Sequence, residues 1–386
     1  MRRHLPILAL AVLAVLAFAV ACGGGDGSTK PGTQPTVEIP VPTPFPGITS
    51  EVVVPNADVP VALAFAPDGR LFYAEQNTGA VRIVSAQGEL LATPFVQTQV
   101  ALAPGWGLLG LALDPEFSTN HYVYLYLTRP VDADTAQPMI VRYIDSSNKG
   151  TQPTTIIDDF PEATLYGEYA VGGDIRFGPD GYLYITVGDH ISTDLAQDLS
   201  SVRGKVLRVD KSDGSAAPDN PFVGQADADP RVYAYGFLDP HDMTFRLGGG
   251  ELYATENGTY FCCDELNVVR KGGNYGWPQI GQGQEGVLPI QFFTFPGTEP
   301  GSTKVRPEGI EFASASAYPA LGDSLLVCEQ ATSYMRRLLL SANQSKVTSD
   351  DVVVADCNLD IAASPDGTIY YSNATEIRKL VAGAGQ

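Results

Sequence analysis

The sequence predicts an all-β protein folded as a six-bladed β-propeller. The first indication is composition, because the 386 residues contain 40 Gly, 29 Pro, 18 Tyr and 16 Phe, while charged residues make up only 18%. This balance is typical of turn-rich β proteins. The second is a strand–turn–strand unit that recurs six times. The third is the lack of long amphipathic helical patterns between these units, which argues against a βαβ arrangement.

The recurring unit is an apolar strand, a turn of the Pro-Asp-Gly type, and a second strand rich in Tyr, Leu and Val. Clear copies occupy 65–73, 177–184 and 364–371, and degenerate copies occupy 113–124, 245–253 and 318–327. Their starts are spaced by roughly 45–75 residues, which suits one propeller blade with its loops. Six copies therefore predict six blades.

A ring of blades must also close on itself. A short strand at 51–54 precedes the first copy, and a final strand at 377–381 follows the last. We expect the N-terminal strand to complete the last blade, because this pairing hides both open edges. Between the strands we expect only one helical turn, near 194–199.

Residues 1–22 resemble a bacterial lipoprotein signal peptide. Arg2 and Arg3 precede an almost wholly apolar stretch over 5–20, and small residues lead to Cys22, which would become the lipidated N-terminus. An ordinary secretory signal or an uncleaved anchor is the alternative, although the apolar stretch is short for a membrane span. Residues 23–47 predict a Pro- and Gly-rich tether. The domain at 48–386 is thus expected outside the cytoplasm, meeting the membrane only through its lipid anchor, or secreted.

Charge excludes one class of partner. The chain has 24 Lys and Arg against 44 Asp and Glu, a formal net charge of −20. Such a surface repels phosphate backbones, so we expect no nucleic-acid binding.

Four cysteines follow Cys22, and an even number is typical of disulfide-bonded extracytoplasmic proteins. We expect a Cys328–Cys357 disulfide, with Cys262 and Cys263 forming a vicinal bridge or remaining free thiols. Their spacing does not suit a zinc site.

Several motifs resemble those of the soluble quinoprotein glucose dehydrogenases, also called glucose/sorbosone or aldose sugar dehydrogenases. In family order they are GLLGLA at 107–112, GGDIRFGPDG at 172–181, AQDL at 196–199, GKVLRV at 204–209, DELN at 264–267 and GGNYGWP at 272–278. The resemblance implies a six-bladed propeller that holds pyrroloquinoline quinone (PQQ) on a calcium ion at the centre of its top face. There a His would take the proton of a sugar C1 hydroxyl while hydride passes to the quinone.

Five positions that serve the quinone in that family hold other residue types here. The replacements are Ala170 for the catalytic His, Trp106 for a Gln, Leu238-Asp239-Pro240 for Arg-Asn-Pro, Ala331 or Thr332 for a Lys, and Cys357-Asn358-Leu359 for Arg-x-Arg. A tricarboxylate would find no basic partner at these positions and one additional carboxylate. The substitutions argue against quinone-dependent oxidation.

Two groups of candidate site residues remain. Glu256 to Thr259, followed by Asp264 and Glu265, resembles the family's calcium loop, and the predicted metal ligands are Gly258, Thr259, Asp264 and Glu265. The alternative is that these acids only satisfy loop amides. The predicted catalytic group is His241, Asp239 and His190. His190 ends Gly188-Asp189-His190 at the exit of a strand, and His241 follows Leu238-Asp239-Pro240, so each has an Asp nearby. The family resemblance implies that both loops approach the top face. The alternative for such a His is a solvated surface position.

The sequence leaves three functional interpretations. The first is a tethered, calcium-containing sugar dehydrogenase of this family with a rearranged cofactor site. The second is a non-catalytic propeller that binds a carbohydrate or protein through its top face. The third is a calcium-dependent, lactonase-like hydrolase using Asp239, His241 or Glu256. All three place a sugar or another small molecule, or a protein partner, at the centre of the top face.

Overall fold

A computed structural model describes residues 45–165, 169–246, 248–259, 264–279, 286–293 and 305–383, all within the compact unit Val41–Gln386. The predicted signal, most of the tether, and Cys262 and Cys263 lie outside the described residues. Among the residues described, no helix is long and apolar enough to cross a membrane.

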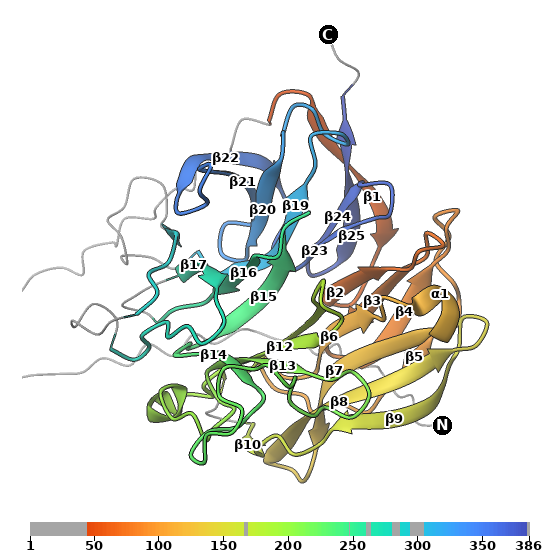
Figure 1. Cartoon of the computed structure of the whole chain (residues 1–386). Helices are drawn as coiled ribbons and strands as arrows, with labels where there is room; N and C mark the ends of the chain where they lie inside the picture. The colour runs from red at the N-terminus through yellow and green to blue at the C-terminus, as the bar shows by residue number, and fades with distance from the viewer. Residues whose placement is uncertain are drawn as a thin grey trace, which may run out of the picture. The chain divides into compact units, whose positions relative to one another are not determined.

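Six antiparallel sheets stand around a common centre, as the sequence predicted (Figure 1). The first blade contains β2 (Pro60–Phe65), β3 (Leu71–Glu75), β4 (Ala80–Val84) and β5 (Val96–Gln97). The second contains β6 (Leu108–Leu113), β7 (Tyr122–Pro130), β8 (Thr135–Asp145), β9 (Gly150–Ile157) and β10 (Ala163–Thr164). The third contains β11 (Gly172–Phe177), β12 (Leu183–Val187), β13 (Lys205–Val209) and β14 (Val232–Tyr235).

The remaining blades follow the same order. The fourth contains β15 (Pro240–Phe245), β16 (Leu252–Glu256), β17 (Asp264–Val269) and β18 (Gln291–Phe293). The fifth contains β19 (Pro307–Ala313), β20 (Ser324–Glu329), β21 (Tyr334–Leu340) and β22 (Val347–Ala355). The sixth contains β23 (Ile361–Ala363), β24 (Ile369–Ser372), β25 (Glu376–Ala382) and β1 (Ile48–Pro55). The innermost strands β2, β6, β11, β15, β19 and β23 contact one another in a closed ring.

Ring closure is confirmed. β1 pairs antiparallel with β25, with Val52 opposite Arg378 and Val54 opposite Ile377, so the first and last strands of the propeller lie side by side (Figure 1). The helical turn expected near 194–199 is a 3₁₀ turn at Thr193–Ala196, and a short helix α1 (Phe117–Asn120) lies in the turn between β6 and β7.

Each copy of the predicted unit forms the turn from the innermost strand to the second strand of its blade. In the three clear copies the Asp carboxylate accepts the amide N–H two residues later, and the Gly adopts a positive φ that favours glycine. These pairs are Asp68 with Arg70, Asp180 with Tyr182 and Asp366 with Thr368, and the glycines are Gly69, Gly181 and Gly367. The Pro-Asp-Gly signature therefore marks one fixed place in the blade.

The core consists of apolar layers between adjacent blades, because both faces of each sheet are covered. Aromatic side chains from the recurring units meet edge to face across these layers. Examples are Phe65 with Tyr370, Tyr124 with Phe177 and Tyr184 with Phe245, whose ring centroids lie 4.8, 5.2 and 5.1 Å apart. These contacts explain why the units are rich in Tyr and Phe.

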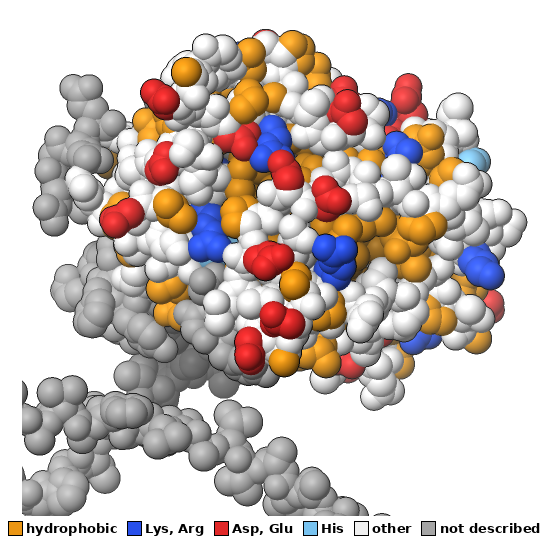
Figure 2. Space-filling model, turned by 90° about the horizontal axis from the view of Figure 1, so that it is seen from below, with side chains coloured by type: hydrophobic (Ala, Val, Ile, Leu, Met, Phe, Trp, Pro, Cys, Tyr) orange, Lys and Arg blue, Asp and Glu red, His pale blue; other side chains and the backbone are white. Residues whose placement is uncertain are grey.

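The predicted Cys328–Cys357 disulfide is present. It joins β20 to the segment that follows β22, and both cysteines are fully buried. On the outer face seen in Figure 2, acidic and basic side chains are interspersed with hydrophobic ones.

Candidate functional site

The ring of inner strands surrounds an axial cavity of about 640 Å³. Residues from all six inner strands line it, together with loop residues near Gln76, Gly105 and Gln330. The lining residues with a carboxyl, imidazole or guanidinium group are Asp174, Arg176, Asp239, His241, Asp242, Arg306, Glu308, Glu311 and Asp360. Six of these nine carry carboxyl groups, so the cavity is acidic like the chain as a whole.

Irregularities in the inner strands aim these acids toward the axis. The register of β11 shifts between Gly172 and Ile175, and that of β15 shifts between Pro240 and Met243. Such bulges redirect side chains. The redirected carboxylates then accept hydrogen bonds from amides of the next inner strand.

Three aspartates join neighbouring blades in this way. Asp174 Oδ2 accepts the Met243 amide at 3.0 Å, Asp242 Oδ2 accepts the Ile310 amide at 2.8 Å, and Asp360 Oδ2 accepts the Leu63 amide at 2.6 Å. At a bulge, the neighbouring strand of the same sheet cannot accept every backbone N–H, so these amides need another acceptor. These acids therefore hold the inner ring together.

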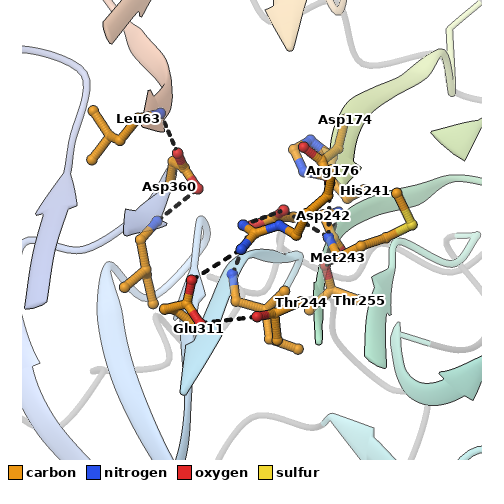
Figure 3. Close-up of polar contacts among 12 residues, drawn as sticks. Leu63, Asp174, Arg176, His241, Asp242, Met243, Thr244, Thr255, Glu311 and Asp360 are labelled. Carbon is orange, nitrogen blue, oxygen red and sulfur yellow. Dashed lines mark hydrogen bonds and ion pairs between the residues drawn. The ribbon is translucent and has the colours of Figure 1, made fainter. Parts of the chain in front are cut away.

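Arg176 lies at the centre of this acidic group (Figure 3). Its guanidinium is 3.0 Å from Glu311 and 3.7 Å from Asp242. Burial opposes the charged guanidinium, but Glu311 and Asp242 outweigh it and raise the pKa of Arg176. Burial, reinforced by Asp242, raises the pKa of Asp174 and of Asp360 well above the ordinary value, although Arg176 opposes this shift.

His241 and Glu308 form a second ionic group in the cavity. His241 Nε2 lies 2.6 Å from Glu308 Oε2, and the ring is 37% exposed into the cavity. Burial works against the imidazolium, but Glu308 and then Asp239 outweigh it and raise the pKa of His241 to about 9. At neutral pH His241 is therefore a hydrogen-bond donor, and it accepts protons only at alkaline pH.

Asp239 lines the cavity beside His241. Its Oδ1 accepts the Gly172 amide at 3.1 Å, and burial raises its pKa while His241 opposes the shift. The structure thus brings together His241 and Asp239, two of the three predicted catalytic residues.

His190 does not join them, because it lies outside the cavity lining. It is buried against Trp106, with ring centroids 5.6 Å apart, and burial followed by Arg203 lowers its pKa to about 3. The carboxylate of Asp189 instead accepts the indole N–H of Trp277 at 2.8 Å and the amide of Ile191 at 2.7 Å. The predicted His190–Asp189 pair therefore does not form.

Asp264, a predicted calcium ligand, accepts three backbone amides, from Gly258 at 3.0 Å, Val305 at 2.7 Å and Arg306 at 3.0 Å. Glu265 is buried directly opposite Glu256 on the neighbouring strand, and the Asn267 amide bridges the two carboxylates. Thr259 precedes a segment outside the described residues. Across the described ranges no cluster of three or more acidic, His or Cys side chains suits a metal ion, and calcium binding stays a prediction.

The positions that replace the family's quinone ligands are now visible. Ala170 and Leu359 line the cavity, Trp106 is fully buried, and Cys357 is in the disulfide. The basic side chains of the described lining are Arg176, Arg306 and His241. Because Arg176 and His241 are already engaged by carboxylates, the residues present do not fit a tricarboxylate quinone.

The sequence did not single out Arg176, Asp242, Glu308, Glu311 or Asp360. A signal was present, since these ionisable residues stand in or beside the segments that form the inner strands of four of the blades. Charges inside such segments are costly unless they meet partners.

The fold and site define a six-bladed propeller with an acidic axial cavity. The family model for glucose / sorbosone dehydrogenase matches residues 57–381. The chain therefore belongs to the glucose/sorbosone dehydrogenase family.

Individual relatives agree with this membership. The aldose sugar dehydrogenase YliI of Escherichia coli K12 is 28% identical over 341 residues, which cover 84% of this chain and 89% of YliI. The quinoprotein glucose dehydrogenase B of Acinetobacter calcoaceticus is 29% identical over 259 residues, covering 60% of this chain and 52% of that protein. The human Hedgehog-interacting protein is 31% identical over 256 residues, covering 58% of this chain and 36% of that protein.

Solved structures show the same architecture. The PQQ-bound aldose sugar dehydrogenase from Streptomyces coelicolor has a TM-score of 0.70 and 25% identity, covering 88% of this chain and 99% of that one. The apo-form aldose sugar dehydrogenase from Escherichia coli has a TM-score of 0.77 and 24% identity, with coverages of 87% and 99%. PQQ is thus a cofactor within the family, and the chain resembles PQQ-dependent aldose sugar dehydrogenases.

Proposed function

We propose that this protein binds a sugar in its axial cavity and does not oxidise it through a quinone. The observation that carries the proposal is the charge of the cavity, whose lining has six carboxyl groups against Arg176, Arg306 and His241. A tricarboxylate entering this cavity would be repelled, whereas a polyhydroxylated ligand carries no such charge.

The cavity also offers the groups that sugars need. Carboxylates accept hydrogen bonds from hydroxyl groups, and the His241 imidazolium donates to hydroxyl oxygens. The volume of about 640 Å³ falls within the usual range of small-molecule sites. Ala170, in place of the family's catalytic His, offers a methyl group that cannot take a proton.

Quinone-dependent sugar oxidation is the second candidate, and the family match over 57–381 favours it. The hydrolase interpretation required Asp239, His241 or Glu256 as its reactive group. Glu256 does not line the cavity, and its Oε1 accepts the Leu238 amide at 2.7 Å.

The test compares cofactor binding with sugar binding on the same purified protein. Calorimetry would measure binding of aldoses, and absorbance would measure retention of PQQ in the presence of Ca²⁺. We expect aldose binding without stoichiometric PQQ retention and without dye reduction. YliI serves as the positive control for dye reduction. PQQ retention accompanied by aldose-dependent dye reduction would overturn the proposal and establish the dehydrogenase.

We also propose that Cys22 tethers the propeller outside the cytoplasm, on the basis of the sequence pattern over 1–47. Replacing Cys22→Ser should move the protein from the membrane fraction to the soluble fraction of the cell envelope. An unchanged membrane fraction would contradict lipidation at this cysteine.

A further inference from the structure

The charges beside His241 do not balance. Two carboxylates, Glu308 and Asp239, act on this one imidazolium, and Glu308 is in direct contact at 2.6 Å. A single imidazolium neutralises one of the two when both are ionised. Arg306 also acts on Asp239, but its side chain is exposed and solvent screens its charge.

The second oxygen of Glu308 is also unused. The side chain is only 3% exposed, and Oε1 accepts no hydrogen bond from any described residue. A buried carboxylate oxygen without a donor is costly, and native proteins seldom leave one in that state. Glu308 lines the cavity, and a turn of its carboxylate would bring Oε1, which is buried as it stands, within reach of a donor on a bound ligand.

The rest of the cavity reinforces the negative charge. Even with Asp174 and Asp360, whose pKa values are raised, counted as protonated, the carboxyl groups of Asp242 and Glu311 outnumber Arg176. Arg306, the other cation of the described lining, has an exposed side chain, so solvent screens its charge. A cationic group entering the cavity would therefore meet a net negative surface.

We propose that the axial cavity prefers a sugar carrying a protonated amine, an amino sugar, over the corresponding neutral sugar. The ammonium group has three donors and no acceptor, which matches an unpartnered carboxylate oxygen. Its hydrogen bonds to Glu308 and Asp239 are charge-assisted and hence stronger than those of a hydroxyl group. This preference rests on the proposed sugar site and names its substrate class.

The test is a calorimetric panel on the whole purified protein at pH 6.5, with glucosamine, glucose, N-acetylglucosamine and glucuronate as probes. We expect glucosamine to bind about tenfold more tightly than glucose, equivalent to about 1.4 kcal/mol. N-acetylglucosamine, which keeps the nitrogen but loses the charge, should bind no better than glucose. Glucuronate should bind more weakly than glucose.

Two variants test the residues. Asp239→Asn removes a charge but keeps an oxygen for the Gly172 amide, and it should reduce the preference to about twofold. Glu308→Gln provides an independent second variant at the unpartnered oxygen. Glu89→Gln, at an exposed position, is the matched control and should retain the tenfold preference.

The outcomes separate the two proposals. Equal binding of glucosamine and glucose, or a full preference in both cavity variants, would overturn the amine preference alone. If none of the sugars binds, the sugar site itself fails and the preference fails with it. Binding of glucosamine without detectable glucose binding would support both.

Discussion

Replacing Arg176→Met should destabilise the propeller more at alkaline than at acidic pH. Arg176 is the cation of the acidic group on the axis, 3.0 Å from Glu311 and 3.7 Å from Asp242. At an effective dielectric constant of about 20, these two attractions amount to roughly 10 kcal/mol before the desolvation of the guanidinium is subtracted. Breaking a buried pair typically costs about 3–5 kcal/mol, which is a large part of the stability of a domain.

The pH dependence follows from the acids left behind. Asp174 and Asp360 already have raised pKa values in the folded protein, and loss of the opposing Arg176 charge raises them further. An acid whose folded pKa is raised stabilises the fold at low pH and loses that contribution as pH rises through its folded pKa. The penalty of the substitution should therefore grow between pH 5 and pH 8.

Urea denaturation at pH 5 and pH 8 measures this difference. Arg176→Lys keeps the positive charge but lacks the planar guanidinium, so its free energy of unfolding should lie between those of the wild type and Arg176→Met. Arg129→Met, at an exposed position, should change the unfolding free energy by less than about 0.5 kcal/mol. An equal loss for Arg176→Met at both pH values, or a loss below about 1 kcal/mol, would refute the electrostatic reasoning.

Three further predictions concern the disulfide, the cavity His and ring closure. Replacing Cys328 and Cys357 with Ser opens a loop with a sequence separation of 29 and should lower the unfolding free energy by about 3.6 kcal/mol in the chain-entropy model; urea curves that match the wild type would contradict it. NMR titration should find His241 with a pKa of about 9, and Glu308→Gln should lower that pKa below about 7. The contribution of His241 to the free energy of unfolding is complete below about pH 6.5 and is lost as pH rises through 9. An unshifted His241 in the variant would exclude Glu308 as the cause. Deleting 45–55 should expose the edge of β25 and cause association visible by size-exclusion chromatography; a monomer with an unchanged melting temperature would show that β1 is dispensable.

The fold was predictable from the sequence because local chemistry repeats. Asp68, Asp180 and Asp366 each bind an amide two residues ahead, and a turn of this kind leaves Pro-Asp-Gly in the three clear copies. Counting the turns gave the number of blades, and the strands outside the first and last turns gave the closure.

The site was only partly predictable, because its contacts join residues far apart in the chain. Leu63 and Asp360 are separated by 297 residues, and the meeting of their amide and carboxylate depends on how the ring closes. The register shifts that aim Asp174 and Asp242 inward leave no pattern in the local sequence. His190 had the surroundings expected of a catalytic residue, but the packing of Trp106 and Trp277 directs the chain there toward the interior.

The pairing of β1 with β25 has a consequence for the order of folding. Ile48 pairs with Ala382, which lies more than three hundred residues later in the chain. The ring therefore stays open until the two ends of the domain have come together. Closure depends on contacts very distant in sequence, which slows assembly. A chain truncated before β25 would keep an unpaired strand at each end, a form open to proteases and to pairing with other chains.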